Sequence, residues 1–109
     1  MNVDGLLKQT LEALGVPVAR LKYDGKAKTF ITYQLVVGRD IHFTDDENEA
    51  EEFTYRVDIY SKTDYISLMR RVKTALKSAG FFGVVFDPEV FESDTGYFHV
   101  PVEIKYMEV

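Results

Sequence analysis

Three stretches of the chain alternate apolar and polar side chains, which is typical of strands that bury one face. The first covers residues 29–37, TFITYQLVV, and the second runs from Phe53 to Ile59. The third covers residues 98–106, where the alternation is most regular. We therefore predict three half-buried strands. Their inward positions are expected to form the core: Ile31–Leu35, Tyr55–Ile59 and Val100–Ile104.

Two other stretches repeat apolar residues at every third or fourth position, which predicts amphipathic helices. One runs from Val3 to Leu14 and the other from Tyr65 to Ala79. A glycine directly follows each stretch, at Gly15 and Gly80, where a left-handed residue commonly ends a helix.

Shorter signals complete the element order. An edge strand is predicted around Pro17 and a further strand over residues 81–86, while residues 23–25 and 93–96 carry turn-forming residues. The predicted order is helix, strand, strand, strand, helix, strand, strand. Strands joined by turns favour antiparallel pairing. We predict a single α+β domain over residues 1–109, with a mostly antiparallel sheet of about five strands and two helices packed on one face.

Composition allows such a core and excludes several classes of site. Of the 109 residues, 46% are hydrophobic and 15 are Phe or Tyr, so a core can form without metals or disulfides. The absence of cysteine removes disulfides, thiolate metal sites and cysteine catalysis. No apolar run approaches the ~20 residues of a membrane span, and the N-terminus has no signal-peptide pattern. We expect a soluble protein that acts inside a cell or in a particle assembled there, without contact with a membrane.

The net charge of −5 is concentrated in one segment. Seven of the 18 acidic residues lie within residues 40–52, and this range contains no Lys or Arg. The other eleven nearly balance the 13 basic residues. We expect residues 40–52 to form a mobile, solvated loop that repels nucleic-acid phosphates. Its residues do not follow the ligand pattern of a calcium loop, because the alternation fails and no glycine is present.

One set of polar residues raises the alternative of a small Mg²⁺-dependent nuclease. Asp87 followed by Glu103 and Lys105 on a strand resembles restriction-type nuclease cores, in which two carboxylates hold Mg²⁺ and a lysine orients water. The competing interpretation is that Glu103 and Lys105 are ordinary residues of a solvent-facing strand. His42 and His99 accompany no nucleophile motif, and His99 is expected to be exposed. We predict no enzymatic activity and no catalytic, cofactor-binding or metal-binding residue.

The second predicted helix carries a basic face opposite its apolar stripe. Such a face is usually solvated surface, but an acidic segment on the same chain offers a complement of opposite sign. Copies that dock basic face to acidic segment would form a head-to-tail ring. The residues of this predicted interface are Asp45, Asp46, Glu47, Glu49, Arg70, Arg71 and Lys77.

Three longer stretches occur in a familiar order: VPVARLKYDGKAKTFITYQL, EEFTYRVDIYSKTDYISLMRRVKTALKSAGF and ESDTGYFHVPVEIKY. A strand with the motif Tyr-x-Val-Asp-Ile-Tyr-Ser-Lys precedes a helix that begins with Asp-Tyr. A Gly-Phe pair ends that helix, and the motif Glu-x-Asp-Thr-Gly-Tyr-x-His comes later in the chain. From about Val16 to Tyr106 the chain resembles the small tail-completion, or tail-terminator, proteins of long-tailed phages and Gram-positive prophages.

The resemblance implies a structural protein without a cofactor. It implies an α+β fold and a homo-oligomeric ring, hexameric in relatives, that caps the tail tube and joins the tail to the head. The implied partners are the tail-tube protein and a head-completion or connector protein, and DNA would pass through the ring without specific binding. The implied location is the head–tail interface of the virion, with assembly in the bacterial cytoplasm. An acidic segment at 40–52 would then either line the lumen or approach a neighbour's basic helix.

Overall fold

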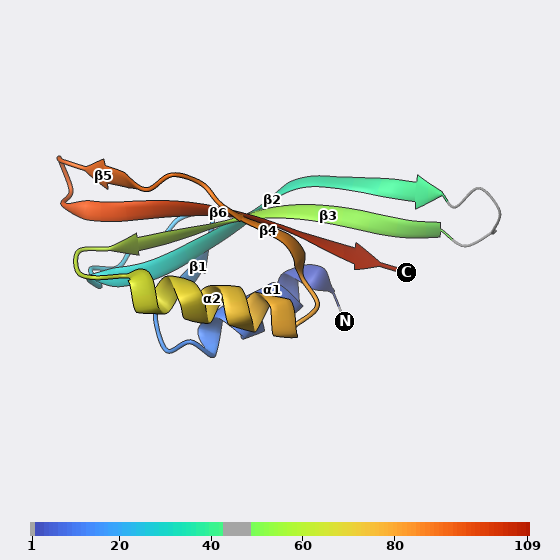
Figure 1. The fold of residues 1–109 in the computed structure, drawn as a ribbon, viewed down its shortest axis with the longest axis horizontal. Coiled ribbons are helices and arrows are strands. Elements are labelled where there is room, and N and C mark those ends of the chain that lie inside the picture. The colour runs from blue at the N-terminus through green and yellow to red at the C-terminus, as the bar shows by residue number, and fades with distance from the viewer. Residues whose placement is uncertain (1, 43–48) are drawn as a thin grey trace.

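The computed structural model describes residues 2–42 and 49–109. These residues form two helices and six strands arranged along one elongated body of 52 × 24 × 23 Å (Figure 1). The elements in chain order are α1 Val3–Glu12, β1 Val18–Arg20, β2 Thr29–His42, β3 Glu49–Ser61, α2 Ile66–Ser78, β4 Phe82–Phe86, β5 Val90–Glu92 and β6 Tyr97–Glu108.

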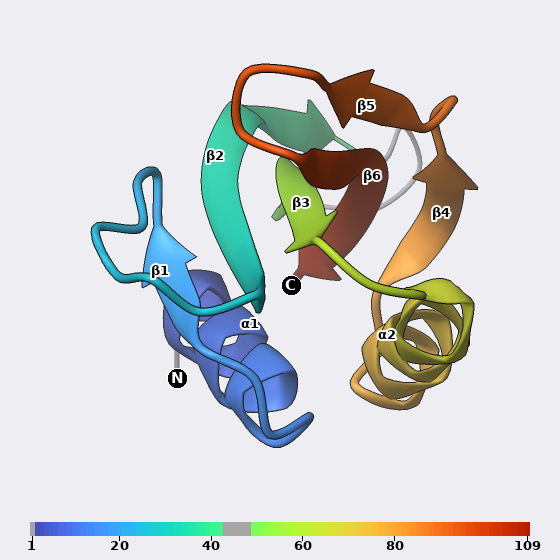
Figure 2. The ribbon, with the colours of Figure 1, turned by 90° about the vertical axis from the view of Figure 1, so that its left-hand side faces the viewer.

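The sheet has the strand order β1-β2-β3-β6-β4, and β5 also pairs with β6. Every pairing is antiparallel except that of β1 with β2, which is parallel. Both helices lie on the same face of the sheet, α1 near the β1 edge and α2 near the β4 edge (Figure 2). The α+β class and the one-sided helix layer are confirmed. The sixth strand is β5, whose three residues are too short to show an alternation in the sequence.

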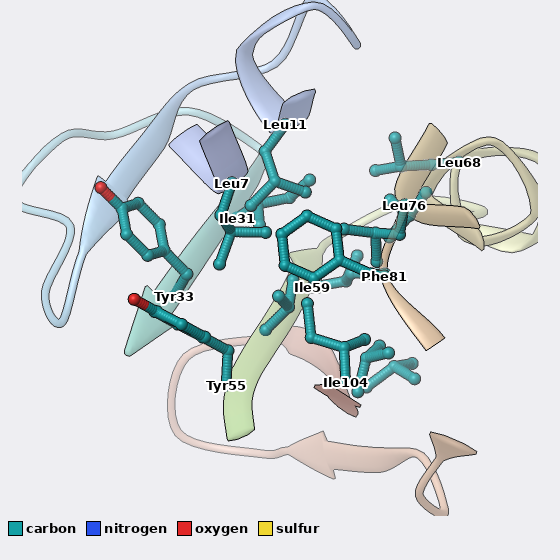
Figure 3. Packing of buried hydrophobic residues seen from close by; sticks show 14 of the residues in the cluster. Leu7, Leu11, Ile31, Tyr33, Tyr55, Ile59, Leu68, Leu76, Phe81 and Ile104 are labelled. Carbon is teal, nitrogen blue, oxygen red and sulfur yellow. The ribbon is translucent and has the colours of Figure 1, made fainter. Parts of the chain in front are cut away.

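The core lies between the helices and the inner face of β2, β3 and β6. Leu7 and Leu11 of α1 and Leu76 of α2 are fully buried against Ile31 and Ile104 of the sheet (Figure 3). The predicted inward positions of β3 and β6 are confirmed. Those positions are Tyr55, Val57, Ile59, Val100, Val102 and Ile104. Burial of apolar surface stabilises a fold by about 25 cal/mol per Å², so this cluster supplies most of the hydrophobic free energy of folding.

The predicted glycines follow both helices. Gly15 and Gly80 both adopt positive φ, at 84° and 101°. The Asn2 side chain accepts from the amide of Gly5 at the start of α1, and Asp64 accepts from the amide of Ile66 at the start of α2. These hydrogen bonds satisfy amides that have no partner inside the helix, from the N-cap residue of α1 and from the residue before the N-cap of α2. Neither helix in the described residues is long and apolar enough to cross a membrane.

The turn expected at Tyr23-Asp24-Gly25 differs in its backbone. Gly25 does not adopt positive φ; a Cβ there would meet the Tyr23 hydroxyl at 2.1 Å, so close approach of that ring is what requires glycine. Among the described non-glycine residues, only Leu21 has positive φ, at 66°. The strained position is thus at the end of β1 and was not predicted.

A polar group borders the core where α1 meets β3. The Tyr55 hydroxyl lies 3.5 Å from an Asp4 carboxylate oxygen, which also lies 3.4 Å from Nε of Arg20. Burial, with a further contribution from the Asp4 carboxylate, raises the pKa of Tyr55 to about 12. The same two causes raise the pKa of Tyr33. Both phenols are therefore held in their neutral form by the fold.

Candidate assembly surfaces

The distal half of the β2–β3 hairpin extends beyond the helix layer (Figure 1). We call residues 35–42 and 49–54 the arm. Leu35, Val36 and Val37 lie at its base and are 43%, 50% and 48% exposed. The prediction that Leu35 belongs to the core is therefore wrong. The register of β2 shifts between Leu35 and Val37, and neither of the two helices in the described residues covers this part of the sheet. Three adjacent exposed apolar residues are unusual for a surface that stays in water.

Strands replace much of the predicted acidic loop. Asp40 lies in β2, and Glu49, Glu51 and Glu52 lie in β3, so the expectation of a loop over 40–52 is wrong at both ends. The hairpin pairing continues as far as His42 with Glu49 because an antiparallel ladder satisfies the backbone groups of both strands. Three predicted interface residues, Asp45, Asp46 and Glu47, lie outside the described residues.

The end of the arm carries a row of carboxylates across three strands. Asp40 pairs with Glu51, which in turn pairs with Glu108 of β6. Like charges directly opposite one another on a sheet are destabilising, so this row favours a cationic partner over isolation in water. Glu108 was not predicted to belong to this surface, because only the pairing of β3 with β6 brings it beside Glu51. By contrast, Glu52 pairs with Arg39 at 2.8 Å.

The predicted basic residues of α2 have different roles. Arg70 and Lys77 are exposed on the helix. The Arg71 guanidinium donates a 2.7 Å hydrogen bond to the carbonyl oxygen of Leu14, just beyond α1. Arg71 therefore connects the two helices, whereas Arg70 and Lys77 are available to a partner. Figure 1 shows α2 under the half of the sheet away from the end of the arm, so the acidic and basic surfaces lie in different parts of one subunit.

A polar cluster lies on the outer face of the sheet, opposite the helices. One Asp58 carboxylate oxygen accepts from Arg56 Nε at 2.9 Å and lies 2.6 Å from His99 Nε2. The other ring nitrogen, Nδ1, is 3.7 Å from a Glu92 oxygen of β5. The His99 ring also stacks on Tyr60 with centroids 4.2 Å apart. The prediction of an exposed His99 is wrong, since its side chain is only 14% exposed.

This cluster is suited to holding the short β5 strand against the sheet. The pairing that creates it, Tyr60 opposite His99, depends on the β3–β6 register and could not be derived from the alternation alone. Burial, together with the Asp58 carboxylate, raises the pKa of Tyr60. Among the described residues, no buried side-chain nitrogen or oxygen lacks a hydrogen-bond partner. We assign the cluster a structural role.

Aromatic rings continue this outer face toward the loop between β1 and β2. Phe30 stacks between Tyr23 and Tyr60, with centroid distances of 4.3 and 4.7 Å. The Tyr97 hydroxyl donates a 2.7 Å hydrogen bond to the carbonyl oxygen of Ala27, and the Ala27 amide donates to the Tyr23 hydroxyl at 3.2 Å. The rings are thus engaged with one another and fix the loop on the sheet.

The three residues of the nuclease alternative lie near one edge of the sheet. Glu103 and Lys105 belong to β6, and Asp87 follows β4 with its amide bonded to the Pro101 carbonyl. Within the described part of the chain, no hydrogen bond or ion pair joins these three side chains, and no group of three or more His, Asp or Glu residues is arranged to hold a metal ion. The structure therefore adds no feature that favours the nuclease.

Comparisons with known proteins show a likeness to solved structures and to no sequence family. No protein-family model matches the sequence, and no curated protein matches it. Solved structures do match, including a chain of a structure described as "Virion of native gene transfer agent (GTA) particle". That chain aligns with a TM-score of 0.57 and 12% identity, over 97% of this chain and 93% of its own length. The two chains therefore share a fold along nearly their whole length.

Proposed function

We propose that this protein is a structural component of a phage or prophage virion, and more closely a tail-completion protein that forms a ring on the tail tube. The observation that carries the proposal is the end-to-end fold similarity to a chain of a gene transfer agent virion. The sequence resemblance to tail-terminator proteins points to the same class of particle. In this role the ring ends tube growth and joins the tail to the head, with the tube protein and a connector protein as neighbours.

The surface of the subunit supports a role in assembly. The exposed Leu35, Val36 and Val37 at the base of the arm are suited to burial against another chain. The carboxylate row at the end of the arm repels phosphates. Such repulsion suits a passage through which DNA must move without being held. No described group of residues suggests a catalytic role, so we propose a non-enzymatic protein through which DNA passes without specific binding.

Two placements of the acidic end remain as alternatives within the ring, and salt distinguishes them. If the end of the arm docks on the exposed Arg70 and Lys77 of a neighbour, assembly weakens as the Debye length falls below its ~8 Å at physiological salt. If it lines the lumen, like-charge repulsion opposes closure, and salt favours assembly or leaves it unchanged.

Light scattering after size-exclusion chromatography tests the ring, and negative-stain microscopy shows its symmetry. We expect a concentration-dependent, closed oligomer, six-fold if the resemblance holds, that binds the end of tail tubes. Arg70→Glu combined with Lys77→Glu should weaken assembly if the acidic end docks on α2. The control is Lys8→Glu, which reverses one positive charge at an exposed position on α1. A subunit that stays monomeric at every concentration and ignores tail tubes would contradict the proposal.

The nuclease alternative is tested directly with supercoiled DNA and Mg²⁺. We expect the DNA to remain intact. Cleavage that disappears in Glu103→Ala and Lys105→Ala variants would replace the structural proposal with the enzymatic one.

A further inference from the structure

The end of β1 presents a leucine on a strained turn. Leu21 has φ of 66°, and the amide of Lys22 donates a 2.7 Å hydrogen bond to the carbonyl oxygen of Arg20. This i to i+2 bond defines a γ-turn with positive φ, a rare and strained form. The Leu21 amide donates to the Tyr33 carbonyl at 2.8 Å, which fixes the turn to the edge of β2. A bulky residue in this conformation costs roughly 1–3 kcal/mol, and such strained positions cluster at binding and functional sites.

The side chain held by this turn faces solvent between two cations. Leu21 is 64% exposed, and the flanking Arg20 and Lys22 side chains are 55% and 81% exposed. Their pairings with Asp4 and Asp24, at 3.4 and 3.3 Å, are ion pairs of exposed side chains and contribute little to stability. The turn therefore offers one apolar projection with a positive charge on each side.

The opposite edge of the molecule carries a hollow of matching character, which we call the α2–β4 hollow. It has a volume of about 270 Å³ and is formed by the start of α2, the end of β4 and the segment that follows β4. This is close to the lower limit of ~300–1,000 Å³ for small-molecule pockets and suits a single side chain. Its walls are the apolar residues Tyr65, Ile66, Met69, Phe86 and Val100.

The rim of this hollow is acidic. Asp87 and Glu89 border it, both are exposed, and neither pairs with a basic side chain in the described part of the chain. Ile66 is 43% exposed at the mouth. The apolar walls of the hollow match the apolar Leu21 side chain, and the two carboxylates at its rim are opposite in charge to the flanking Arg20 and Lys22.

The topology places the two features on opposite flanks. β1 and β4 are the two ends of the strand order β1-β2-β3-β6-β4, and Figure 2 shows β1 and α2 on opposite sides of the molecule. A contact between two different patches of one chain is head-to-tail, and it closes into a ring when the rotation between neighbours allows closure. The occupant that fits the hollow on charge and position is thus a second copy of this chain.

We propose that Leu21 of one subunit inserts into the α2–β4 hollow of the next, with Arg20 and Lys22 facing Asp87 and Glu89. This inference rests on the proposed ring and names a contact that builds it. The strain at Leu21 is held in the subunit by the hydrogen bond of its amide to Tyr33. On assembly the projecting side chain is buried, and a small central set of side chains provides most of the binding energy of an interface.

Leu21→Gly tests the contact without endangering the fold. Glycine adopts positive φ without strain, so the monomer should unfold at the same urea concentration as the wild type or a higher one. Removal of the side chain should raise the concentration at half-assembly by roughly tenfold or more, as measured by sedimentation velocity over a concentration series. Val85→Ala, which truncates a 53% exposed apolar residue of β4 that does not line the hollow, is the matched control and should change assembly little.

A charge exchange tests the rim separately. Lys22→Asp alone and Asp87→Lys alone should each weaken assembly, and the double variant should recover most of the loss because it restores opposite charges across the contact. Rings that form normally from Leu21→Gly, or a double variant no better than the singles, would overturn this contact while leaving the proposed ring intact. A wild-type protein that does not self-associate at any concentration would overturn both.

Discussion

The boundary of the core along β2 is open to a sharp test, because sequence and structure disagree about one residue. Ile31 and Leu35 are four residues apart on one strand, and their alternation predicts that both face inward. In the structure Ile31 is 0% exposed in the cluster beneath the helices, whereas Leu35 is 43% exposed at the base of the arm. The same truncation at the two positions should therefore have different effects.

The magnitudes follow from burial. Ile31→Ala removes fully buried methyl groups and leaves a cavity, which costs about 2–5 kcal/mol. That is a large part of the ~5–15 kcal/mol expected for a whole domain. Leu35→Ala leaves no closed cavity, and nearly half of the side chain is already in water, so we expect a loss of about 1 kcal/mol or less.

Urea unfolding followed by far-UV circular dichroism measures both losses. With a slope of ~2 kcal/mol per molar urea, the middle of the usual range, Ile31→Ala should lower the midpoint by about 1–2.5 M and Leu35→Ala by about 0.5 M or less. The protein concentration is kept below that of self-association, because assembly stabilises the folded subunit by mass action. Equal shifts for the two variants would mean that the core continues along the arm, and the boundary described above would then be wrong.

Three further outcomes are expected. Val57→Asp should abolish cooperative folding, because an unpaired charge at a 0% exposed position costs several kcal/mol, and a folded variant would contradict the core. In the folded protein the pKa of Tyr55 is raised from 10 to about 12, so the fold favours the neutral phenol. The part of the unfolding free energy that comes from this preference is complete below pH 10 and is lost as the pH rises from 10 to 12. Tyr55→Phe should therefore lose less stability than the wild type between pH 9 and 12, as urea midpoints will measure. Asp58→Ala should cost roughly 1.5–3 kcal/mol and accelerate amide exchange in β5, since Arg56 and His99 lose their shared partner; protection unchanged in β5 would argue against this role.

Local chemistry alone determined most of the secondary structure. The period of two in residues 53–59 and 98–106 predicted both central strands, because half-buried strands alternate their side chains. The apolar stripes and terminal glycines predicted α1 and α2 to within three residues at their ends. Fold class and the side on which the helices lie follow from these elements, since each apolar face must be covered.

Register and coverage were decided only by the tertiary structure. The partner of His99, the row formed by Asp40, Glu51 and Glu108, and the existence of β5 all depend on which residues lie opposite one another across strands. Leu35 looks like a core residue because its own strand has the right period, yet burial requires a helix above it, and the helices end before the arm. A one-dimensional pattern specifies the face on which a side chain lies; only the packing of distant segments specifies whether anything covers that face.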